Sequence, residues 1–322
     1  MDALSEVLNT VRLEGALYLD VEFGAPWCIR GKCGRATVGQ WLPGAEHVIF
    51  FHFLTEGACK VRLADGAEVL AVAAGDLVLF PQDDRHLMGS DLNLAPLETE
   101  NVSFRSTLKG GELNVVRMGG TGPVTHFVCG YLASSRSASR PLIEALPRVL
   151  RIPIGDGQAS VLVRELLRAG VRESGLTQPG AASTLAKLAE LLFVEALRRY
   201  VANLPPDDKG WFAAVRDAYV GRALSLLHEA PGRGWTVDEL AREVALSRSA
   251  LAERFTALIG EPPMQYLKRW RLALAARALR AGSEAIGRIA DQSGYESEAA
   301  FTRAFKREFG VPPREWRKTP TM

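Results

Sequence analysis

Two cysteines, Cys28 and Cys33, are the residues of this 322-residue chain best placed for redox chemistry. They lie in the segment CIRGKCG, where Arg30, Lys32 and Arg35 bring positive charge close to both thiols. Positive charge lowers a thiol pKa and favours the thiolate, which is the form that reacts with oxidants. A loop that contains glycine could also close into a disulfide. The segment therefore predicts a sensor of oxidants or electrophiles, and the candidate residues for it are Cys28, Cys33, His52, His86 and Cys129.

The same cysteines also suit a metal site by their spacing from His47 and His52. A zinc finger needs its two histidines on one face of a helix, whereas the segment HVIFFHFL has the composition of a strand. Residues five apart on a strand point to opposite faces, so we expect no zinc finger. A metal ion, zinc by its ligand types, stays open with Cys28, Cys33, His52 and His86 as ligands.

The elements that would hold these residues are short apolar segments broken by Gly, Pro and Asp-Gly, which is typical of an all-β barrel or sandwich. The segment GDLVLFPQDDRH resembles the second motif of cupins, and this resemblance implies that His86 points into the barrel. Phe50 stands where cupin enzymes carry an acidic metal ligand. The resemblance therefore implies a cupin-like sensor domain, in which a bound organic effector is a third kind of signal.

The other cysteines and histidines have simpler interpretations. Cys59 and Cys129 lie in strand-like segments, where a buried and inert thiol is the common state. His47 and His126 are expected to be partly buried and hydrogen-bonded, and His228 to lie near the C-terminal end of a helix without a functional role.

One pattern occurs twice in about the last eighty residues, starting at Val237 and again at Ile286. Ser247 aligns with Ser297, and further along the repeat glycine aligns with glycine and proline with proline. Each copy predicts a short helix, a tight turn and a second helix that begins after a serine cap, so one supersecondary unit is used twice.

The second helix of each copy has the features of a DNA recognition helix. Phe301, Phe305 and Phe309 recur every four residues and form one buried stripe, while basic residues lie on the opposite side. Basic side chains attract phosphate, and small ones let a helix enter the major groove. Glu253 either reads a cytosine or pairs with a neighbouring arginine. The candidate DNA-binding residues are Arg248, Ser249, Glu253, Arg254 and Thr256 in the first copy, and Glu298, Ala299, Arg303, Lys306 and Arg307 in the second.

Charge is distributed unevenly along the chain. From residue 204 onward there are 19 basic and 15 acidic residues, against 20 and 22 before it. Between Lys268 and Lys318 the counts are 12 and 6, so the basic excess is concentrated around the second copy. This is where an electrostatic footprint for nucleic acid is expected.

The repeat, and above all the run GYESEAAFTRAFKREFGVPPREWR, resembles the DNA-binding domain of the AraC/XylS family of transcription regulators, over Trp211 to Arg317. This resemblance implies that two helix-turn-helix units read successive major grooves of double-stranded DNA, that the protein is a homodimer, and that it activates transcription by contacting RNA polymerase. The start MDALS is similar to that of oxidant-responsive members.

Together these features predict an α+β multidomain protein with an N-terminal cupin-like β-barrel, a helical connector that dimerises, and a C-terminal all-α domain with two helix-turn-helix units. The predicted ranges are 1–135 for the sensor, 136–204 for the connector, 205–210 for the linker and 211–322 for the DNA-binding domain. No apolar run has membrane-spanning length and the N-terminus lacks the pattern of a secretory signal, so we expect a cytoplasmic protein without membrane contact.

The predicted function is a sequence-specific regulator, an activator by resemblance, that responds to an oxidant or electrophile and is not an enzyme. A metal- or organic-ligand-responsive regulator is the alternative. Two further readings are a cupin enzyme fused to a DNA-binding domain, and an architectural protein whose barrel only dimerises.

Overall fold

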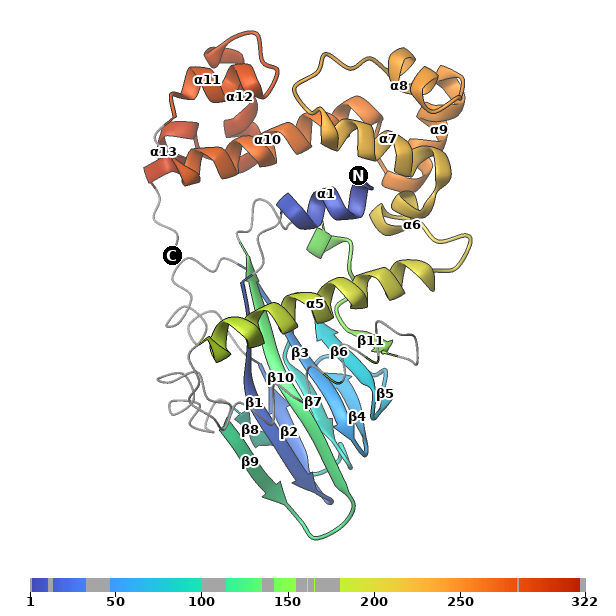
Figure 1. Ribbon diagram of the computed structural model, residues 1–322, viewed down its shortest axis with the longest axis vertical. Coiled ribbons are helices and arrows are strands. Elements are labelled where there is room, and N and C mark those ends of the chain that lie inside the picture. Colours follow the sequence, from blue (N-terminus) through green and yellow to red (C-terminus); the bar gives the residue numbers. More distant parts are fainter. Residues whose placement is uncertain are drawn as a thin grey trace. The chain divides into compact units, whose positions relative to one another are not determined.

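The computed structural model describes residues 2–10, 14–32, 47–99, 114–134, 142–154, 161, 165, 180–282 and 284–318. These residues belong to two compact units (Figure 1). The sheet unit comprises Leu13–Ser134 and Leu146–Tyr200, and the helical unit comprises Met1–Arg12, Ser135–Ala145 and Val201–Met322. None of the helices in the described ranges is long and apolar enough to cross a membrane.

The sheet unit is built from two sheets. The larger has the strand order β11-β6-β3-β10-β1-β9 and the smaller has the order β5-β4-β7-β2-β8. The strands are β1 (Glu14–Gly24), β2 (Cys28–Gly31), β3 (His47–Glu56), β4 (Ala58–Leu63), β5 (Leu70–Ala73), β6 (Asp76–Phe80), β7 (His86–Gly89), β8 (Leu97–Glu98), β9 (Asn114–Gly119), β10 (Val124–Ser134) and β11 (Leu150–Pro153). The predicted β-barrel of cupin type is confirmed.

Alternation along the strands fills the space between the two sheets. On β3 the residues Val48, Phe50 and Leu54 join one hydrophobic core, and on β10 Phe127 and Tyr131 join the same core. Successive side chains of a strand point to opposite faces, so the residues between them in sequence point the other way. His52 shares the parity of Phe50 and therefore lies inside the barrel among aromatic rings.

Helix α5 (Ala181–Ala202) lies within the range 136–204 that was predicted to be a dimerising helical connector. Leu188, Leu192 and Leu197 are already buried within one chain. Leu191 is an exposed large hydrophobic residue of this helix. These three leucines are therefore used within one chain, and homodimerisation through α5 stays a prediction.

The helical unit contains α1 (Ala3–Thr10), α6 (Trp211–Arg216), α7 (Ala218–Glu229), α8 (Val237–Glu243), α9 (Arg248–Ile259), α10 (Pro263–Ala281), α11 (Ile286–Gln292), α12 (Glu298–Phe309) and α13 (Pro313–Lys318). Figure 1 shows α10 running between the pair α8–α9 and the pair α11–α12. The predicted pair of helix-turn-helix units is thereby confirmed. Helix α1, which the sequence grouped with the barrel, packs against α7 through Ala3, Leu4 and Val7.

The two helix-turn-helix units repeat each other in their backbone hydrogen bonds. The hydroxyl of Ser247 accepts from the N–H of Ala250, and that of Ser297 accepts from the N–H of Ala300, both at 3.2 Å. Each second helix ends at a left-handed glycine, with φ of 85° at Gly260 and 80° at Gly310. These caps satisfy terminal backbone groups and set the length of each helix.

The turn inside each unit also needs a left-handed residue, and the two copies supply different ones. Ala245 has a φ of 55° in the first turn, and Gly294 has a φ of 72° at the corresponding place in the second. An L-residue with a Cβ is strained in this conformation, whereas glycine is not. The first turn therefore stores strain that the second does not.

We expect Ala245→Gly to raise the free energy of unfolding by about 1 kcal/mol, because it removes the left-handed strain. The matched change Gly294→Ala should lower it by a similar amount or more, because a Cβ there would lie 3.0 Å from the guanidinium carbon of Arg271. Urea denaturation of the full chain measures both changes. A loss of stability in Ala245→Gly would contradict the assignment of strain.

Candidate functional site

The buried side of α12 fixes the orientation of its exposed side. Phe301 and Phe305 are fully buried, and Phe309 packs at 4.5 Å from Phe305, measured between ring centroids. Trp316 closes the cluster at 4.9 Å from Phe309. The predicted phenylalanine stripe is confirmed, and the opposite side of the helix is held toward solvent. The exposed residues there include Glu298, Ala299, Arg303, Lys306 and Arg307.

Arg303 has the features of a base-reading side chain. It lies near the middle of α12, and it makes no hydrogen bond or ion pair with another described residue. An arginine with all its donors available can bind guanine through two hydrogen bonds in the major groove. Lys306 and Arg307, one turn later, are exposed and add charge suited to phosphate.

The corresponding helix α9 offers less free positive charge. Arg254 donates to both carboxylate oxygens of Asp217, with contacts of 2.6, 2.9 and 3.1 Å. Asp217 is also the N-cap of α7, accepting from the N–H groups of Tyr219 and Val220. Arg248 pairs with Asp238 at 3.4 Å, and both side chains are largely exposed. The predicted contact by Arg254 therefore competes with an existing ion pair, whereas Ser249, Glu253 and Thr256 are exposed on the same helix.

Inside the barrel, three sensor candidates meet in one hydrogen-bonded chain. Cys129 and His52 are cross-strand partners on β10 and β3, and the Cys129 Sγ lies 3.0 Å from His52 Nδ1. His52 Nε2 lies 3.0 Å from the Nε2 of His86, which comes from the other sheet. His86 Nδ1 lies 3.0 Å from the carbonyl oxygen of Asp84. All three side chains are buried, so the chain crosses the barrel interior.

The carbonyl at one end fixes every proton in this chain. Because the Asp84 carbonyl can only accept, His86 carries its proton on Nδ1 and accepts at Nε2. His52 must then donate from Nε2 and accept at Nδ1, so the Cys129 thiol donates to His52. Burial lowers the pKa of both imidazoles, to about 4 for His86, which keeps them neutral. From the sequence, a buried and inert thiol was the simpler interpretation of Cys129. Its partner His52 is distant in the sequence and is brought close only by the pairing of β10 with β3.

Cys28, the first cysteine of the CIRGKCG motif, does not have the environment that the sequence predicted. Cys28 is buried, and its pKa is raised by that burial and by the charge of Asp91, which together outweigh Arg30 and Arg62. The expectation of a lowered thiol pKa at Cys28 was therefore wrong, because desolvation was not visible in the sequence. Cys33 and Arg35 lie outside the described residues.

The predicted metal ligands are only partly brought together. His52 and His86 face each other, but Cys28 precedes Ile29, a residue of the barrel core, so its side chain points to the other face of β2. Within the ranges that the structure describes, no group of three or more His, Cys, Asp or Glu side chains has a metal-binding arrangement. Phe50 lies 4.8 Å from His52 and 5.7 Å from His86, between ring centroids, and occupies space that an acidic ligand would need.

A second cluster joins three strands around His126, which is part-buried and hydrogen-bonded, as the sequence predicted. The Asp20 carboxylate accepts from Nε2 of His126, and His126 Nδ1 lies 2.9 Å from the Thr55 hydroxyl. That hydroxyl donates to the His126 carbonyl oxygen at 3.1 Å, so it accepts from Nδ1. Both ring nitrogens therefore donate, which is the pattern of an imidazolium. The hydrogen bond to Asp20 raises the His126 pKa, and the nearby carboxylates add to this against the effect of burial.

The hydrogen-bonded pair of His126 and Asp20 predicts a pH dependence of stability. A folded pKa above the unfolded value of about 6.5 stabilises the fold below that pH, and the stabilisation is lost as pH rises through the folded pKa. We expect the stability difference between the natural chain and His126→Gln to shrink above about pH 6.5. Urea denaturation of both proteins between pH 5 and pH 9 measures this difference in the free energy of unfolding. The pH dependence that both proteins share cancels in the comparison. A difference that stays constant over this range would rule out a charged His126.

Comparisons with known proteins agree with both units. Residues 2–202 match the cupin family, and residues 240–319 match the helix-turn-helix domain family. A protein of Streptomyces lividans named as an AraC-like transcription regulator is 34% identical over the full length of both chains. The transcriptional regulator AlkR of Acinetobacter baylyi is 30% identical, and the RCS-specific transcriptional activator RclR of Escherichia coli is 27% identical. These two alignments cover 99% of this chain and 99% and 98% of the relatives.

The site geometry and these similarities agree on the two parts of the protein. The helix-turn-helix repeat presents basic residues outward, and the barrel that accompanies it encloses Phe50 among buried histidines. The chain belongs to the AraC family of DNA-binding transcription regulators, with a cupin domain ahead of its helix-turn-helix domain.

Proposed function

We propose that this regulator senses a small oxidant through Cys129 and binds DNA sequence-specifically through α9 and α12. The observation that carries the proposal is the hydrogen bond from the Cys129 thiol to the neutral imidazole of His52. An imidazole that accepts from a thiol can take its proton when the sulfur reacts. The relative RclR is named as an RCS-specific transcriptional activator, which supports an oxidant as the signal and activation as the outcome.

The reaction with a hydroperoxide can be written with these residues alone. The Cys129 sulfur attacks the terminal peroxide oxygen, its proton passes to His52 Nδ1, and the O–O bond breaks. The leaving alkoxide or hydroxide takes the proton back from His52 and departs as an alcohol or water. The sulfenic acid that forms carries one more oxygen in a fully packed interior, so it must disturb the β3–β10 register at His52.

Burial sets which oxidants can react. Cys129 is 3% exposed, so only small molecules that enter the barrel during its fluctuations can reach the sulfur. We infer that the barrel acts as a sensor and not as an enzyme, because Phe50 fills the place beside the two histidines. RNA polymerase contact and homodimerisation follow from family resemblance and form part of the proposal.

The test uses the full chain, hydrogen peroxide and mass spectrometry of each cysteine, with DNA affinity measured on the same samples. Oxygen should be added at Cys129, DNA affinity should change, and Cys129→Ser should abolish that change. Cys28→Ser is the matched control and should behave like the natural chain. A disulfide between Cys28 and Cys33 with Cys129 intact would move the sensor to the cysteine motif, and unchanged DNA affinity after oxidation would overturn the proposal.

A further inference from the structure

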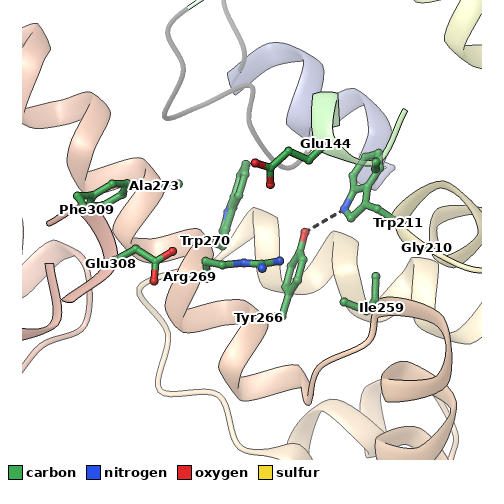
Figure 2. Close-up of a pocket in the computed structure, with 11 residues that line it drawn as sticks. Glu144, Gly210, Trp211, Ile259, Tyr266, Arg269, Trp270, Ala273, Glu308 and Phe309 are labelled. Atoms are coloured by element: carbon green, nitrogen blue, oxygen red, sulfur yellow. Dashed lines mark hydrogen bonds between the residues drawn. The ribbon is translucent and has the colours of Figure 1, made fainter. Parts of the chain in front are cut away.

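The helical unit contains a cavity of about 300 Å³ that none of the functions above uses. It lies where α10 meets the ends of α9 and α12, and a segment at Glu144 completes its wall. Figure 2 shows the rings of Trp211, Tyr266 and Trp270 around it. A volume of this size is at the small end of the range for ligand pockets.

Hydrogen bonds hold the aromatic wall in one arrangement. Trp211 Nε1 donates to the Tyr266 hydroxyl at 3.0 Å, shown as the dashed line in Figure 2. The same hydroxyl is hydrogen-bonded to Nε2 of His228 at 2.8 Å. Trp270 packs against the His228 ring at 4.4 Å between centroids. The rings are therefore preformed and lose little freedom when a ligand binds.

The cavity has a negative balance of charge. Arg269 is the positive residue in its wall, and its guanidinium already contacts Glu261 at 2.6 Å. Burial raises the pKa of Glu261, Arg269 lowers it, and the charge of Glu308 raises it again, which places Glu308 in the same electrostatic group. Glu144 and Glu308 both line the cavity. The charged residues that line the cavity are thus two carboxylates and one guanidinium, and that guanidinium is already paired with Glu261, which favours a cationic ligand.

One polar atom of the aromatic residues in the wall is sealed from both solvent and the cavity. The indole nitrogen of Trp270 is buried and has no hydrogen-bond partner among the described residues. Trp270 itself is 4% exposed. A buried donor without an acceptor is unfavourable, and because this nitrogen is not exposed to the cavity, it is a cost of the fold and not a contact for a ligand.

We propose that this cavity binds a small organic cation that has an apolar part, and that its occupancy changes DNA affinity. Aromatic faces attract organic ammonium groups, and the carboxylates supply the opposite charge. Ile259 of α9, Ala273 of α10 and Glu308 of α12 all contribute to the wall, so a ligand touches both helix-turn-helix units. The effect of the ligand on DNA affinity rests on the proposed DNA-binding function. By thermodynamic linkage, bound DNA must change the affinity for the ligand by the same factor.

Two probes of matched shape, choline phenyl ether and its uncharged analogue 3,3-dimethylbutyl phenyl ether, test the charge preference on the full chain by calorimetry. The smaller phenoxyacetate serves as an anionic probe. The cation should bind about tenfold more tightly than the neutral ether, and the anion should bind least. Equal affinity of the cation and its neutral analogue, or a preference for phenoxyacetate, would overturn the proposal.

Charge-removing variants locate the binding. The double variant Glu144→Gln and Glu308→Gln changes two exposed side chains and should lower the affinity for choline phenyl ether about tenfold while leaving the neutral ether unchanged. Glu243→Gln, exposed on α8 and outside the cavity, is the matched control and should have no effect. If the double variant binds choline phenyl ether as tightly as the natural chain does, the probe binds elsewhere and the proposed site is contradicted.

Measurements of DNA affinity separate ligand binding in the cavity from its coupling to DNA binding. Saturating choline phenyl ether should shift the DNA dissociation constant of the natural chain and not that of the double variant. Binding of the probe without any shift would overturn the coupling but not the site. If the protein prefers no DNA sequence at all, the proposed function fails, while the probe affinities still decide whether the cavity binds cations.

Discussion

Phe305→Ala is expected to destabilise the second helix-turn-helix unit by about 3–5 kcal/mol. The ring is fully buried and lies against Phe301 at 5.5 Å and Trp316 at 5.8 Å, between centroids. Its removal leaves a cavity at the point where α12, α13 and α10 are held together. Because this cluster also sets which side of α12 faces solvent, DNA binding should be lost together with the fold of this unit.

Hydrogen exchange of backbone amides in α11, α12 and α13 of the full chain measures this loss locally. Arg307→Ala serves as the control, because it changes an exposed residue of the same helix and should alter stability by about 0.5 kcal/mol or less. A loss below about 1 kcal/mol in Phe305→Ala would mean that the aromatic cluster does not organise the unit.

Arg303→Ala is expected to weaken binding to the preferred DNA sequence by about 1–3 kcal/mol, roughly 5- to 150-fold, and to relax the preference at one position of the site. The physical reason is that the guanidinium has no partner among the described residues and so is available to a base. The preferred sequence is first selected from a random pool by the natural chain. Binding to that sequence and to random DNA is then compared at one salt concentration, because phosphate contacts depend strongly on salt.

Arg254→Ala provides the contrast in the other recognition helix. Its guanidinium is held by Asp217, so the change should leave base preference nearly intact. It should cost at most about 1 kcal/mol of stability, since the arginine is half exposed. Equal weakening of specific and random binding by Arg303→Ala would assign Arg303 to phosphate contact. A larger loss of preference in Arg254→Ala would show that the ion pair opens on DNA.

The helix-turn-helix repeat could be predicted in detail because its signals are local. Serine caps at Ser247 and Ser297, left-handed glycines at Gly260 and Gly310 and a four-residue phenylalanine period act over single turns of helix. Such signals depend on neighbours in the sequence and survive without knowledge of the rest of the fold. The exposed side of α12 follows from the same period, so Arg303 was predictable as an outward residue.

The barrel site depended on contacts that no local pattern contains. Cys129 and His52 are brought together by the register of β10 with β3, and His86 arrives from the opposite sheet. The positive residues near Cys28 were correctly seen in the sequence, but the burial that outweighs them was not. Similarly, Arg254 looked free until the fold placed the Asp217 carboxylate beside it.

The sequence alone therefore determined the class of protein, its repeated DNA-binding helices and the all-β character of the N-terminal part. Tertiary structure decided which thiol has a base, which arginine is already paired, and that α1 and Glu144 belong with the helical unit. The physical reason is the range of the interactions: caps and periodicity act within a few residues, whereas desolvation and side-chain pairing depend on distant segments that only the folded chain brings together.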